Sequence, residues 1–568
     1  MPPRITRLIA PLAALAASSV GAILFAAPGG ATLHVPAEHP SLSAALAVAS
    51  NGDVIQLAPG TYTEPFAFNG TVVTIRGTPA APHLTVLAPV AQNRSDLLEI
   101  PAMPDGGTIT LEGLTLGGFA AFTVAGGSLS IQDSAVTADS NGLSIAFALS
   151  NGSLLVERTT IANSGFEPHA MPLFSVSGGT ATFRHVTTAA GSRPLFRGES
   201  CVAEITETTI AGLTLDPLPD QAAAVEAVGG SLTIERSLFA NIGPGTGVRI
   251  DGAIALISET DFVAVGHPFK GFDCAIIADG PSTTLIECTF EQCGSFAAPA
   301  SVAILAGAET TLEDCHLANN MLSDTGSGAL LITGNATIRD SIFIANSTFG
   351  RGGAALVTGS ATFLGCDFTA NVGGDGGGAI AVVDAGQADL VDCTLVANAA
   401  GDGLYASEAS GGGVLVEGGT LALTDSTLLA NIAAASGKEF GFGGGVAVID
   451  GGHAAIVDTN LLHNIAMTAG GGLAIDIRST ASVSNATLCS NVPDQVSGEF
   501  LSLGTQVICG CPGDITGDGT VDATDLAMLL GAWGPCGPFG SVPADLLPDG
   551  SVDAGDLAIL LGAWGACE

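Results

Sequence analysis

The sequence predicts an all-β solenoid, a long rod built from similar turns of chain stacked on one another. Short runs of Val, Ile, Leu and Thr between Gly, Asn and Asp indicate strands and turns. A phrase that ends in asparagine recurs at intervals of 25, 27, 33, 33 and 27 residues, and a glycine cluster follows most copies. The asparagines of these phrases are Asn346, Asn371, Asn398, Asn431, Asn464 and Asn491.

The composition fits one long body with an acidic surface. The chain has 568 residues, of which 78 are Gly and 47% are apolar, so it is not a disordered chain. Its net charge of −39 disfavours nucleic acid, which needs clustered Lys and Arg, and disfavours strongly anionic polysaccharides by repulsion. These values indicate a soluble extracellular protein.

Residues 1–31 are predicted to be a signal peptide. Arg4 and Arg7 precede an uncharged stretch that runs to about Ala27 and ends among small residues. The alternative is an uncleaved membrane anchor, because the apolar run approaches ~20 residues. We predict cleavage, secretion, and no membrane span in the mature chain.

The rod is predicted over residues 32–508, with a helix at residues 41–50 that covers its first turn. Ser41 can cap this helix, and residues 54–57 follow as a strand. The phrase HVPAEHPSLSAALAVASNGDVIQLAPGTYTE resembles the opening of right-handed parallel β-helix proteins of the pectin-lyase-like superfamily. The resemblance implies a right-handed parallel β-helix solenoid with an N-terminal capping helix. At roughly 25 residues per coil, about 17 to 19 coils are expected.

The repeats are most regular at residues 285–491, where they align small residues two positions before a Phe or Leu. We predict that these small side chains stack inside the rod as a ladder, with the cysteines as buried thiols. Disulfides between neighbouring coils or metal ligation are the alternatives. The column consists of Cys288, Cys315, Ser341, Cys366, Cys393, Ser426, Thr459 and Ala486.

An acidic column stands one position earlier, and we predict a solvated turn edge there. Binding of divalent ions or a glycan along that edge is the alternative. The asparagines from Asn320 to Asn491 are predicted to serve turns, because Asn bonds backbone groups and tolerates the left-handed conformation. The acids are Glu287, Asp314, Asp340, Asp392, Asp425 and Asp458, with Gly365 interrupting them.

These repeats, FxxN followed by GGA and an aliphatic residue, resemble those of chlamydial polymorphic outer membrane proteins over about 150 residues. The resemblance suggests a β-helical surface of the passenger kind. The composition after the repeats predicts a different module there rather than a C-terminal translocator barrel.

Residues 511–568 form a different module, in which two copies of a loop and helix are offset by 31 residues. In each copy, acids at loop positions 1, 5, 9 and 12 surround a Gly at position 6, the oxygen-rich pattern that Ca²⁺ prefers. Loop 514–525 offers Asp514, Thr516, Asp518, Thr520, Asp522 and Asp525. Loop 545–556 offers Asp545, Asp549, Ser551, Asp553 and Asp556, and lacks a ligand at position 3, Leu547.

This duplicated loop–helix unit resembles a type I dockerin. The resemblance implies calcium-dependent docking onto a cohesin-like domain of a scaffold or surface protein, hence an extracellular location, either free or attached to the cell surface. Loop positions 10 and 11, which contribute to partner choice in that family, are here Ala523, Thr524, Ala554 and Gly555; the Ser-Thr pair of cellulosomal dockerins is missing. Trp533 and Trp564 are predicted to pack the helices, with partner docking as the alternative. The pairing of Cys509, Cys511, Cys536 and Cys567 stays open, although Cys511 with Cys567 would clasp the ends of the module.

No catalytic motif is found in the rod, so the sequence does not decide whether the protein is an enzyme. The most suggestive cluster is His267, Lys270 and Asp273, where Lys or His could act as the base of a β-elimination. An ordinary loop explains it better. The rod has only two Tyr and no Trp for stacking sugar rings. The preferred function is a structural, adhesive or glycan-interacting rod tethered by calcium-dependent docking; the alternative is a dockerin-borne polysaccharide lyase or glycoside hydrolase.

Overall fold

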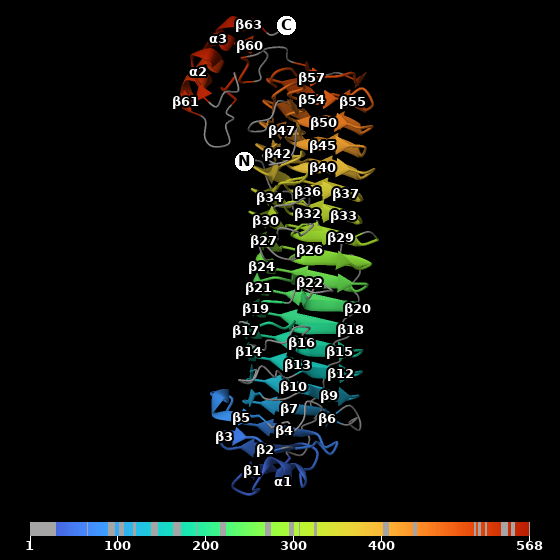
Figure 1. Cartoon of the computed structure of the whole chain (residues 1–568), viewed down its shortest axis with the longest axis vertical. Coiled ribbons are helices and arrows are strands. Elements are labelled where there is room, and N and C mark those ends of the chain that lie inside the picture. The colour runs from blue at the N-terminus through green and yellow to red at the C-terminus, as the bar shows by residue number, and fades with distance from the viewer. Residues whose placement is uncertain are drawn as a thin grey trace, which may run out of the picture.

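The computed structural model shows a rod of stacked parallel strands with a small helical module at its C-terminal end (Figure 1). It describes residues 30–566 except 65, 89–96, 101–106, 118–120, 138–145, 163–171, 190, 216–222, 267–273, 295–299, 306, 323–326, 402–407, 435–439, 505–506, 509–512, 517–519, 536–542 and 547–550. The predicted signal peptide lies outside this range, apart from its last residues. In the described part of the chain no helix is long and apolar enough to cross a membrane.

Each coil of the rod contributes a strand to up to three faces, and the described strands of these faces pair with those of neighbouring coils in parallel and in register. Face 1 consists of β6 (Leu97–Ile100), β9 (Ala121–Ala125), β12 (Phe147–Ser150), β15 (Phe174–Ser177), the first parts of β18 (Phe196–Thr206) and β20 (Ala223–Glu235), β22 (Thr246–Asp251), β25 (Ile276–Asp279), β28 (Val302–Ile304), β32 (Leu330–Ile332), β36 (Ala355–Val357), β40 (Ile380–Val383), β45 (Val414–Glu417), β50 (Val446–Ile449), β54 (Leu473–Ile475) and β57 (Val496–Ser497).

Face 2 follows face 1 in each coil and includes the second parts of β18 and β20. Its other strands are β1 (Thr32–Val35), β2 (Asp53–Leu57), β4 (Val73–Arg76), β7 (Thr108–Glu112), β10 (Ser128–Gln132), β13 (Ser153–Glu157), β16 (Thr180–Arg184), β23 (Ile254–Ser258), β26 (Ser282–Ile286), β29 (Glu309–Glu313), β33 (Asn335–Arg339), β37 (Ser360–Leu364), β41 (Gln387–Val391), β46 (Thr420–Thr424), β51 (His453–Val457), β55 (Thr480–Ser484) and β58 (Leu501–Leu503).

Face 3 closes each coil, and it holds 18 strands among the described residues, in agreement with the expected number of coils. Its strands are β3 (Gly60–Tyr62), β5 (Thr85–Leu87), β8 (Thr115–Leu116), β11 (Ala135–Thr137), β14 (Thr160–Ala162), β17 (Thr187–Ala189), β19 (Thr209–Ala211), β21 (Leu238–Ile242), β24 (Asp261–Val265), β27 (Thr289–Glu291), β30 (His316–Ala318), β34 (Ile342–Ile344), β38 (Asp367–Thr369), β42 (Thr394–Val396), β47 (Thr427–Leu429), β52 (Asn460–Leu462), β56 (Thr487–Cys489) and β59 (Val507–Ile508).

The regular coils add a short fourth ladder: β31 (Met321–Leu322), β35 (Ser347–Thr348), β39 (Val372–Gly373), β43 (Ala399–Ala400), β48 (Ile432–Ala433) and β53 (Ile465–Ala466). A separate pair is formed by β44 (Glu408–Ser410) and β49 (Phe440–Phe442). The core is one continuous column of inward-facing side chains. Its rings stack from coil to coil, as Phe122 does on Phe147 with centroids 5.1 Å apart. Eleven of the twelve largest fully buried side chains are Phe, so the aromatic rings of the rod lie mainly in this column.

The turn from face 2 to face 3 explains both the small-residue column and the acidic column. The residue before each small one has a left-handed backbone, with φ of 52° at Glu287 and 63° at Gly365, and its side chain is exposed. Asp and Gly tolerate this conformation best, so Gly365 interrupts the acids without disturbing the turn. The small residues are buried, and Cys288, Cys315, Cys366 and Cys393 are free thiols, which confirms the predicted ladder.

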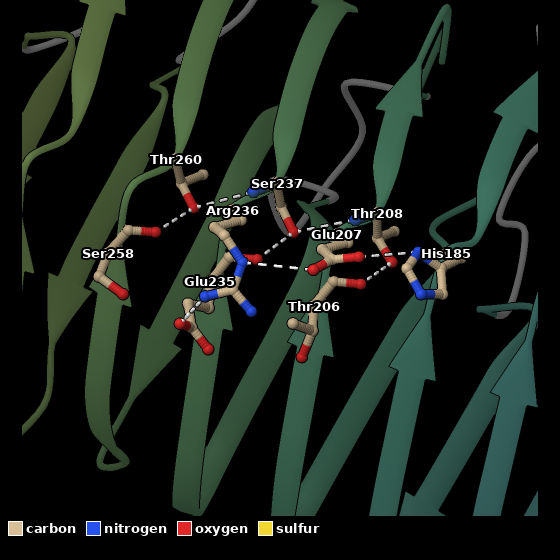
Figure 2. A network of polar contacts seen from close by, with 9 residues as sticks. All are labelled: His185, Thr206, Glu207, Thr208, Glu235, Arg236, Ser237, Ser258 and Thr260. Carbon is tan, nitrogen blue, oxygen red and sulfur yellow. Dashed lines mark hydrogen bonds and ion pairs between the residues drawn. The ribbon is translucent and has the colours of Figure 1, made fainter.

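Figure 2 shows the same turn in earlier coils, where the exposed column contains basic as well as acidic residues. Arg236 Nε lies 3.4 Å from Glu207 Oε1, and His185 Nδ1 lies 2.9 Å from Glu207 Oε2. Inside the turn, Ser237 Oγ donates to the Glu235 carbonyl at 2.9 Å and accepts the amide of Thr208 at 3.2 Å. The inner hydroxyls therefore tie each turn to the next coil.

The prediction that the recurring asparagines serve turns and bond backbone groups is confirmed: Asn398 lies between β42 and β43, and its Nδ2 donates to the Phe368 carbonyl at 3.0 Å. The expectation that they adopt the left-handed conformation there is wrong. The residue before each asparagine is left-handed instead, for example Ala397 with φ of 53°. The asparagines from Asn320 to Asn491 are buried and form a ladder, in which each Nδ2 up to Asn464 donates to the next Oδ1 at 2.8–3.0 Å. The stacked amides satisfy one another, because this second inward turn repeats in register.

The glycine clusters that follow the asparagines are required by close backbone approach. Gly411 has φ of 70°, and a Cβ there would lie 2.3 Å from a backbone oxygen. At Gly412 a Cβ would lie 2.4 Å from the carbonyl oxygen of Gly444 in the next coil. Stacked coils therefore touch through their backbones at this position, which leaves no room for a side chain.

The N-terminal end of the rod carries the short helix α1 (Leu42–Leu46), shorter than the expected 41–50 segment. Ser41 is its N-cap and accepts the amide of Ala44 at 3.1 Å. Leu42 and Leu46 are buried against the first strands. A single 3₁₀ turn, η1 (Pro82–Leu84), precedes β5.

The C-terminal module contains two helices in a reciprocal arrangement. β60 (Thr520–Val521) precedes α2 (Ala523–Gly531) and pairs antiparallel with β63 (Gly565–Ala566), which follows the other helix. β61 (Gly534–Pro535), which follows α2, pairs with β62 (Ser551–Val552), which precedes α3 (Ala554–Gly562). Each half thus closes the other around a small core of Ile515, Val521, Leu529, Ala544, Val552 and Leu560.

Two contacts tie this end of the chain together. Ser490 on the last regular coil donates to the backbone carbonyl of Asp514, and Cys489 is disulfide-bonded. The partner of Cys489 and the four cysteines of the predicted module pairing lie outside the described residues. The sequence analysis did not assign Cys489 to a disulfide, because it occupies the position of Leu462 in the preceding coil and no local motif marks it.

Candidate functional site

The C-terminal module holds four aspartates that are nearly fully buried. Their relative exposures are 0% at Asp514, 0% at Asp525, 2% at Asp545 and 0% at Asp556, the first and last positions of the two predicted loops. Carboxylates are rarely buried unless a cation or several hydrogen bonds compensate their charge. The same two positions are buried in both copies, so the pattern belongs to the repeat.

In the first loop the buried carboxylates converge on one backbone segment. Thr516 Oγ1 donates to Asp514 Oδ1 at 3.3 Å, and the Thr516 amide donates to Asp525 Oδ1 at 2.8 Å. The Asp522 amide donates to Asp525 Oδ2 at 2.8 Å. Loop positions 1, 3 and 12 therefore already lie together.

The second loop repeats the helix start closely. The Asp553 amide donates to Asp556 Oδ2 at 2.7 Å, and Asp553 accepts the amide of Gly555 at 2.7 Å. Both helices thus begin with a capping box made by positions 9 and 12, Asp522 with Asp525 and Asp553 with Asp556. These reciprocal bonds aim the position-12 carboxylate back into its loop.

The C-terminal segment itself supplies no basic side chain to these acids, and His463 of the rod, which is attracted to Asp514, has its pKa lowered by burial. The sequence has no Lys, Arg or His between residue 479 and residue 568. Burial alone would raise the pKa of Asp525, but the backbone amides of Asp522 and Thr516 more than offset it, so the pKa of Asp525 lies below its usual range. The carboxylate is therefore held ionised, as a hard cation requires.

The residue types of the two predicted loops are the oxygen donors that Ca²⁺ prefers, and the structure describes part of each loop. The predicted ligands Asp518 and Asp549 lie outside the described residues. Among the residues described, no group of three His, Cys, Asp or Glu side chains is close enough to hold a metal. The described members of the predicted sites are Asp514, Thr516, Thr520, Asp522, Asp525, Asp545, Ser551, Asp553 and Asp556.

The prediction that the two tryptophans pack the module core is wrong. Trp533 and Trp564 are each 48% exposed, and Leu530 and Leu561 are exposed beside them. The helices are too short to bury both faces, and the core is already filled by smaller side chains. The same exposed Leu and Trp therefore recur at the C-terminal end of each helix, Leu in its last turn and Trp just after it.

A second cluster lies on the outer side of face 1. Arg197, Glu226 and Arg249 occupy the same position on three successive coils, and Arg197 Nη1 lies 3.3 Å from Glu226 Oε2. Asp251 and Asp279 are register partners on β22 and β25. This charged patch combines guanidinium groups that can hold an anion with carboxylates that can move protons.

The loop that carries His267, Lys270 and Asp273 joins β24 to β25, next to the charged patch in the chain. These three residues lie outside the described residues, so the structure does not test whether they converge. The sequence analysis missed the charged patch, because its members are separated by 20 to 30 residues and only the register of the coils brings them together.

Comparisons with known proteins bear on the rod alone. A search of curated proteins finds no match. Solved structures with similarity include a mannuronic acid specific polysaccharide family 6 lyase from human gut microbiota, with 11% identity over 80% of this chain and 86% of that one and a TM-score of 0.23. They also include the family 6 alginate lyase AlyGC, with 9% identity over 84% of this chain and 99% of that one and a TM-score of 0.19. The Siphovirus 9NA tailspike receptor binding domain has 10% identity over 84% of this chain and 76% of that one, with a TM-score of 0.19.

Similarity at these scores carries no argument about activity. The family model described as "Right handed beta helix region" matches residues 221–498, which include the regular coils. Residues 221–498 are therefore a right-handed β-helix region, as the repeats and the opening phrase predict.

Proposed function

We propose that the protein is a secreted β-helix rod that calcium-dependent docking of its C-terminal module tethers to an extracellular or cell-surface assembly. The observation that carries the proposal is the pair of buried aspartates at positions 1 and 12 of both loops, in a segment without a basic residue. Bound Ca²⁺ would supply the missing positive charge and fix the two loops.

The residues that would hold the ion are the loop aspartates and their hydroxyl neighbours. Asp514, Asp525, Asp545 and Asp556 are buried, and Thr516 bonds Asp514 and Asp525 in the first loop, which supports the proposal. Asp518 and Asp549 complete the pattern in sequence. Calcium would neutralise repulsion among these acids and so keep the helices and their exposed tryptophans in place.

The exposed surfaces that follow α2 and α3 are the proposed docking elements. Trp533 and Trp564 offer large, rigid apolar area of the kind that anchors protein interfaces. A cohesin-like domain is the partner that the loop–helix resemblance suggests. The docked module would attach the rod to the assembly, where the rod would have a structural, adhesive or glycan-interacting role.

The test is binding of the intact mature chain to immobilised cohesin domains, in calcium and in EGTA. We expect binding in calcium only, and loss of binding in the Trp533→Ala, Trp564→Ala double variant. Met467→Ala, which removes an exposed apolar side chain from the rod, is the matched control and should bind normally. Equal binding in calcium and EGTA would contradict the proposal.

The charged patch on face 1 favours a second candidate function, an enzyme acting on polysaccharides. A guanidinium such as that of Arg249 could neutralise a substrate carboxylate, and Lys270 or His267 in the adjoining loop could supply a base. The enzymatic function is tested by incubating the protein with a panel of polysaccharides and measuring the release of reducing ends and of unsaturated products. The enzymatic function would be favoured over a purely structural rod if Lys270→Ala or Arg249→Ala abolished the activity. Arg339→Ala, which removes an exposed arginine from β33, is the control and should keep the activity.

A further inference from the structure

A shallow groove of about 400 Å³ lies on the outer side of face 2, near the N-terminal end of the rod. It crosses β7, β10, β13 and β16, four successive coils, and is far along the chain from both sites described above. Three coil spacings give it a length of roughly 14 Å. This groove is not used by the proposed docking or by the charged patch.

The floor of the groove is a regular array of hydroxyl groups. Thr108, Ser128, Ser153 and Thr180 are register partners and form one column. Thr110, Ser130 and Thr182 belong to a second column two residues along each strand, which Leu155 completes. Hydroxyls that donate and accept, repeated with the coil spacing of about 4.8 Å, suit a ligand that is itself a chain of hydroxyl-bearing units with a similar repeat.

One edge of the groove carries an amide and a guanidinium. Gln132 donates from Nε2 to Ser130 Oγ at 2.9 Å, which leaves its carbonyl oxygen for a ligand hydroxyl. Arg184 stands at the far end of the same edge. Leu155 gives the floor an apolar patch that can contact the C–H side of a sugar ring.

The charges around the groove are already paired with one another. Arg76 Nε lies 2.7 Å from Glu112 Oε2, Arg158 Nη1 lies 2.7 Å from Glu157 Oε1, and Arg184 Nη2 lies 3.3 Å from Glu204 Oε2. The rim therefore offers no spare cation to an anionic ligand, and the whole chain carries −39. A neutral ligand is favoured over a polyuronate.

Beyond the groove its two columns continue with polar and exposed aliphatic side chains. The first column runs from Thr180 through Val202 and Ser231 to Ile254. The second column runs from Thr182 through Glu204 and Thr233 to Leu256. Val202, Ile254 and Leu256 are 56%, 57% and 40% exposed. An extended chain leaving the groove along the rod axis would find apolar contacts there.

We infer that this groove binds a neutral, extended, β-linked hexose chain that lies parallel to the rod axis. The inference goes beyond the proposed tethering and does not depend on it: a rod that binds a neutral glycan would keep that binding without calcium. It also differs from the enzymatic alternative, because no carboxylate–base pair lines the groove.

The test is isothermal titration of the intact mature chain with cellopentaose and mannopentaose, and with penta-mannuronate as the anionic comparator. We expect at least one neutral pentasaccharide to bind, penta-mannuronate to bind at least tenfold more weakly, and EGTA to change nothing. Ser153→Trp fills the groove from an exposed position and should weaken binding at least tenfold. Ser360→Trp adds the same side chain to the same column on β37 and should leave binding unchanged.

Several results would overturn the inference. The ligand class would be refuted if both neutral pentasaccharides failed to bind at millimolar concentration. It would also be refuted if penta-mannuronate bound more tightly than the neutral pentasaccharides. Equal weakening by Ser153→Trp and Ser360→Trp would refute the location. Gln132→Ala provides a second variant at a half-buried surface position, should Ser153→Trp fail to fold; it should weaken binding several-fold, and unchanged binding would also count against the groove.

Discussion

Replacing Asn398 in the middle of the buried ladder should open the rod locally. Its Nδ2 donates to Asn431 Oδ1 at 2.9 Å and to the Phe368 carbonyl at 3.0 Å. Its Oδ1 accepts the amide and the Nδ2 of Asn371, both at 2.9 Å. Asn398→Ala removes all four bonds, and at ~1 kcal/mol net for each the loss is about 4 kcal/mol. The partners stay buried, so their desolvation adds to this loss and local relaxation subtracts from it.

The effect should stay near the substituted coil, because each coil of a solenoid contacts only its neighbours. Hydrogen exchange of the Asn371 amide measures it directly, and about 4 kcal/mol corresponds to roughly a thousandfold faster exchange. Asn335→Ala removes an exposed asparagine from β33 and should change the opening free energy by no more than about 0.5 kcal/mol. Equal exchange rates in the two variants would refute the view that the ladder stabilises the rod.

Three further predictions concern glycine, thiol and ion-pair positions. Gly411→Ala should destabilise the rod by more than about 2 kcal/mol in a denaturant titration, because position 411 has a left-handed backbone and a Cβ there would lie 2.3 Å from a backbone oxygen. Gly451 also has a left-handed backbone but open space around it, so Gly451→Ala should lower the free energy of unfolding by only about 1 kcal/mol. Burial raises the pKa of Cys293 to about 12. The contribution of the buried thiol to stability is therefore complete below the unfolded pKa of about 8.5 and is lost as the pH rises toward 12. Iodoacetamide at pH 9 should label Cys293 only after unfolding, and labelling of the native chain would argue against its burial. Arg158→Ala should lower the free energy of unfolding by at most ~1 kcal/mol, because the Arg158–Asp133 ion pair is exposed. Arg158 lowers the pKa of Asp133, so the ion pair contributes to stability above pH ~3.9 and ceases to contribute as the pH falls through the lowered pKa. Unfolding titrations should therefore show a stability difference between the native protein and the variant at pH 7 and none at pH 2.

The sequence predicted the rod well because a solenoid repeats one local rule. Alternation of apolar residues located the inward positions, and the alignment of Cys288 with Ser341 and Thr459 correctly placed the small residues inside. The number of coils followed from the period alone. These features depend on near neighbours in sequence, which the repeat copies many times.

Features that depend on stacking could not be predicted in the same way. Asn is common in left-handed turns, and only contact between coils shows that Asn398 points inward to another amide. Trp533 was expected in a core, but the size of the module leaves it exposed. The charged patch and the hydroxyl groove combine residues from several coils, so they emerge from register and have no local motif.

Calcium titration of the intact mature chain by calorimetry tests the central claim most directly. We predict binding of two ions per chain and loss of that binding in the Asp525→Ala, Asp556→Ala double variant. Asp392→Ala, which removes an exposed acid from the turn column of the rod, should leave the titration unchanged. No calcium binding, or the same binding in the double variant, would contradict the account of the C-terminal module.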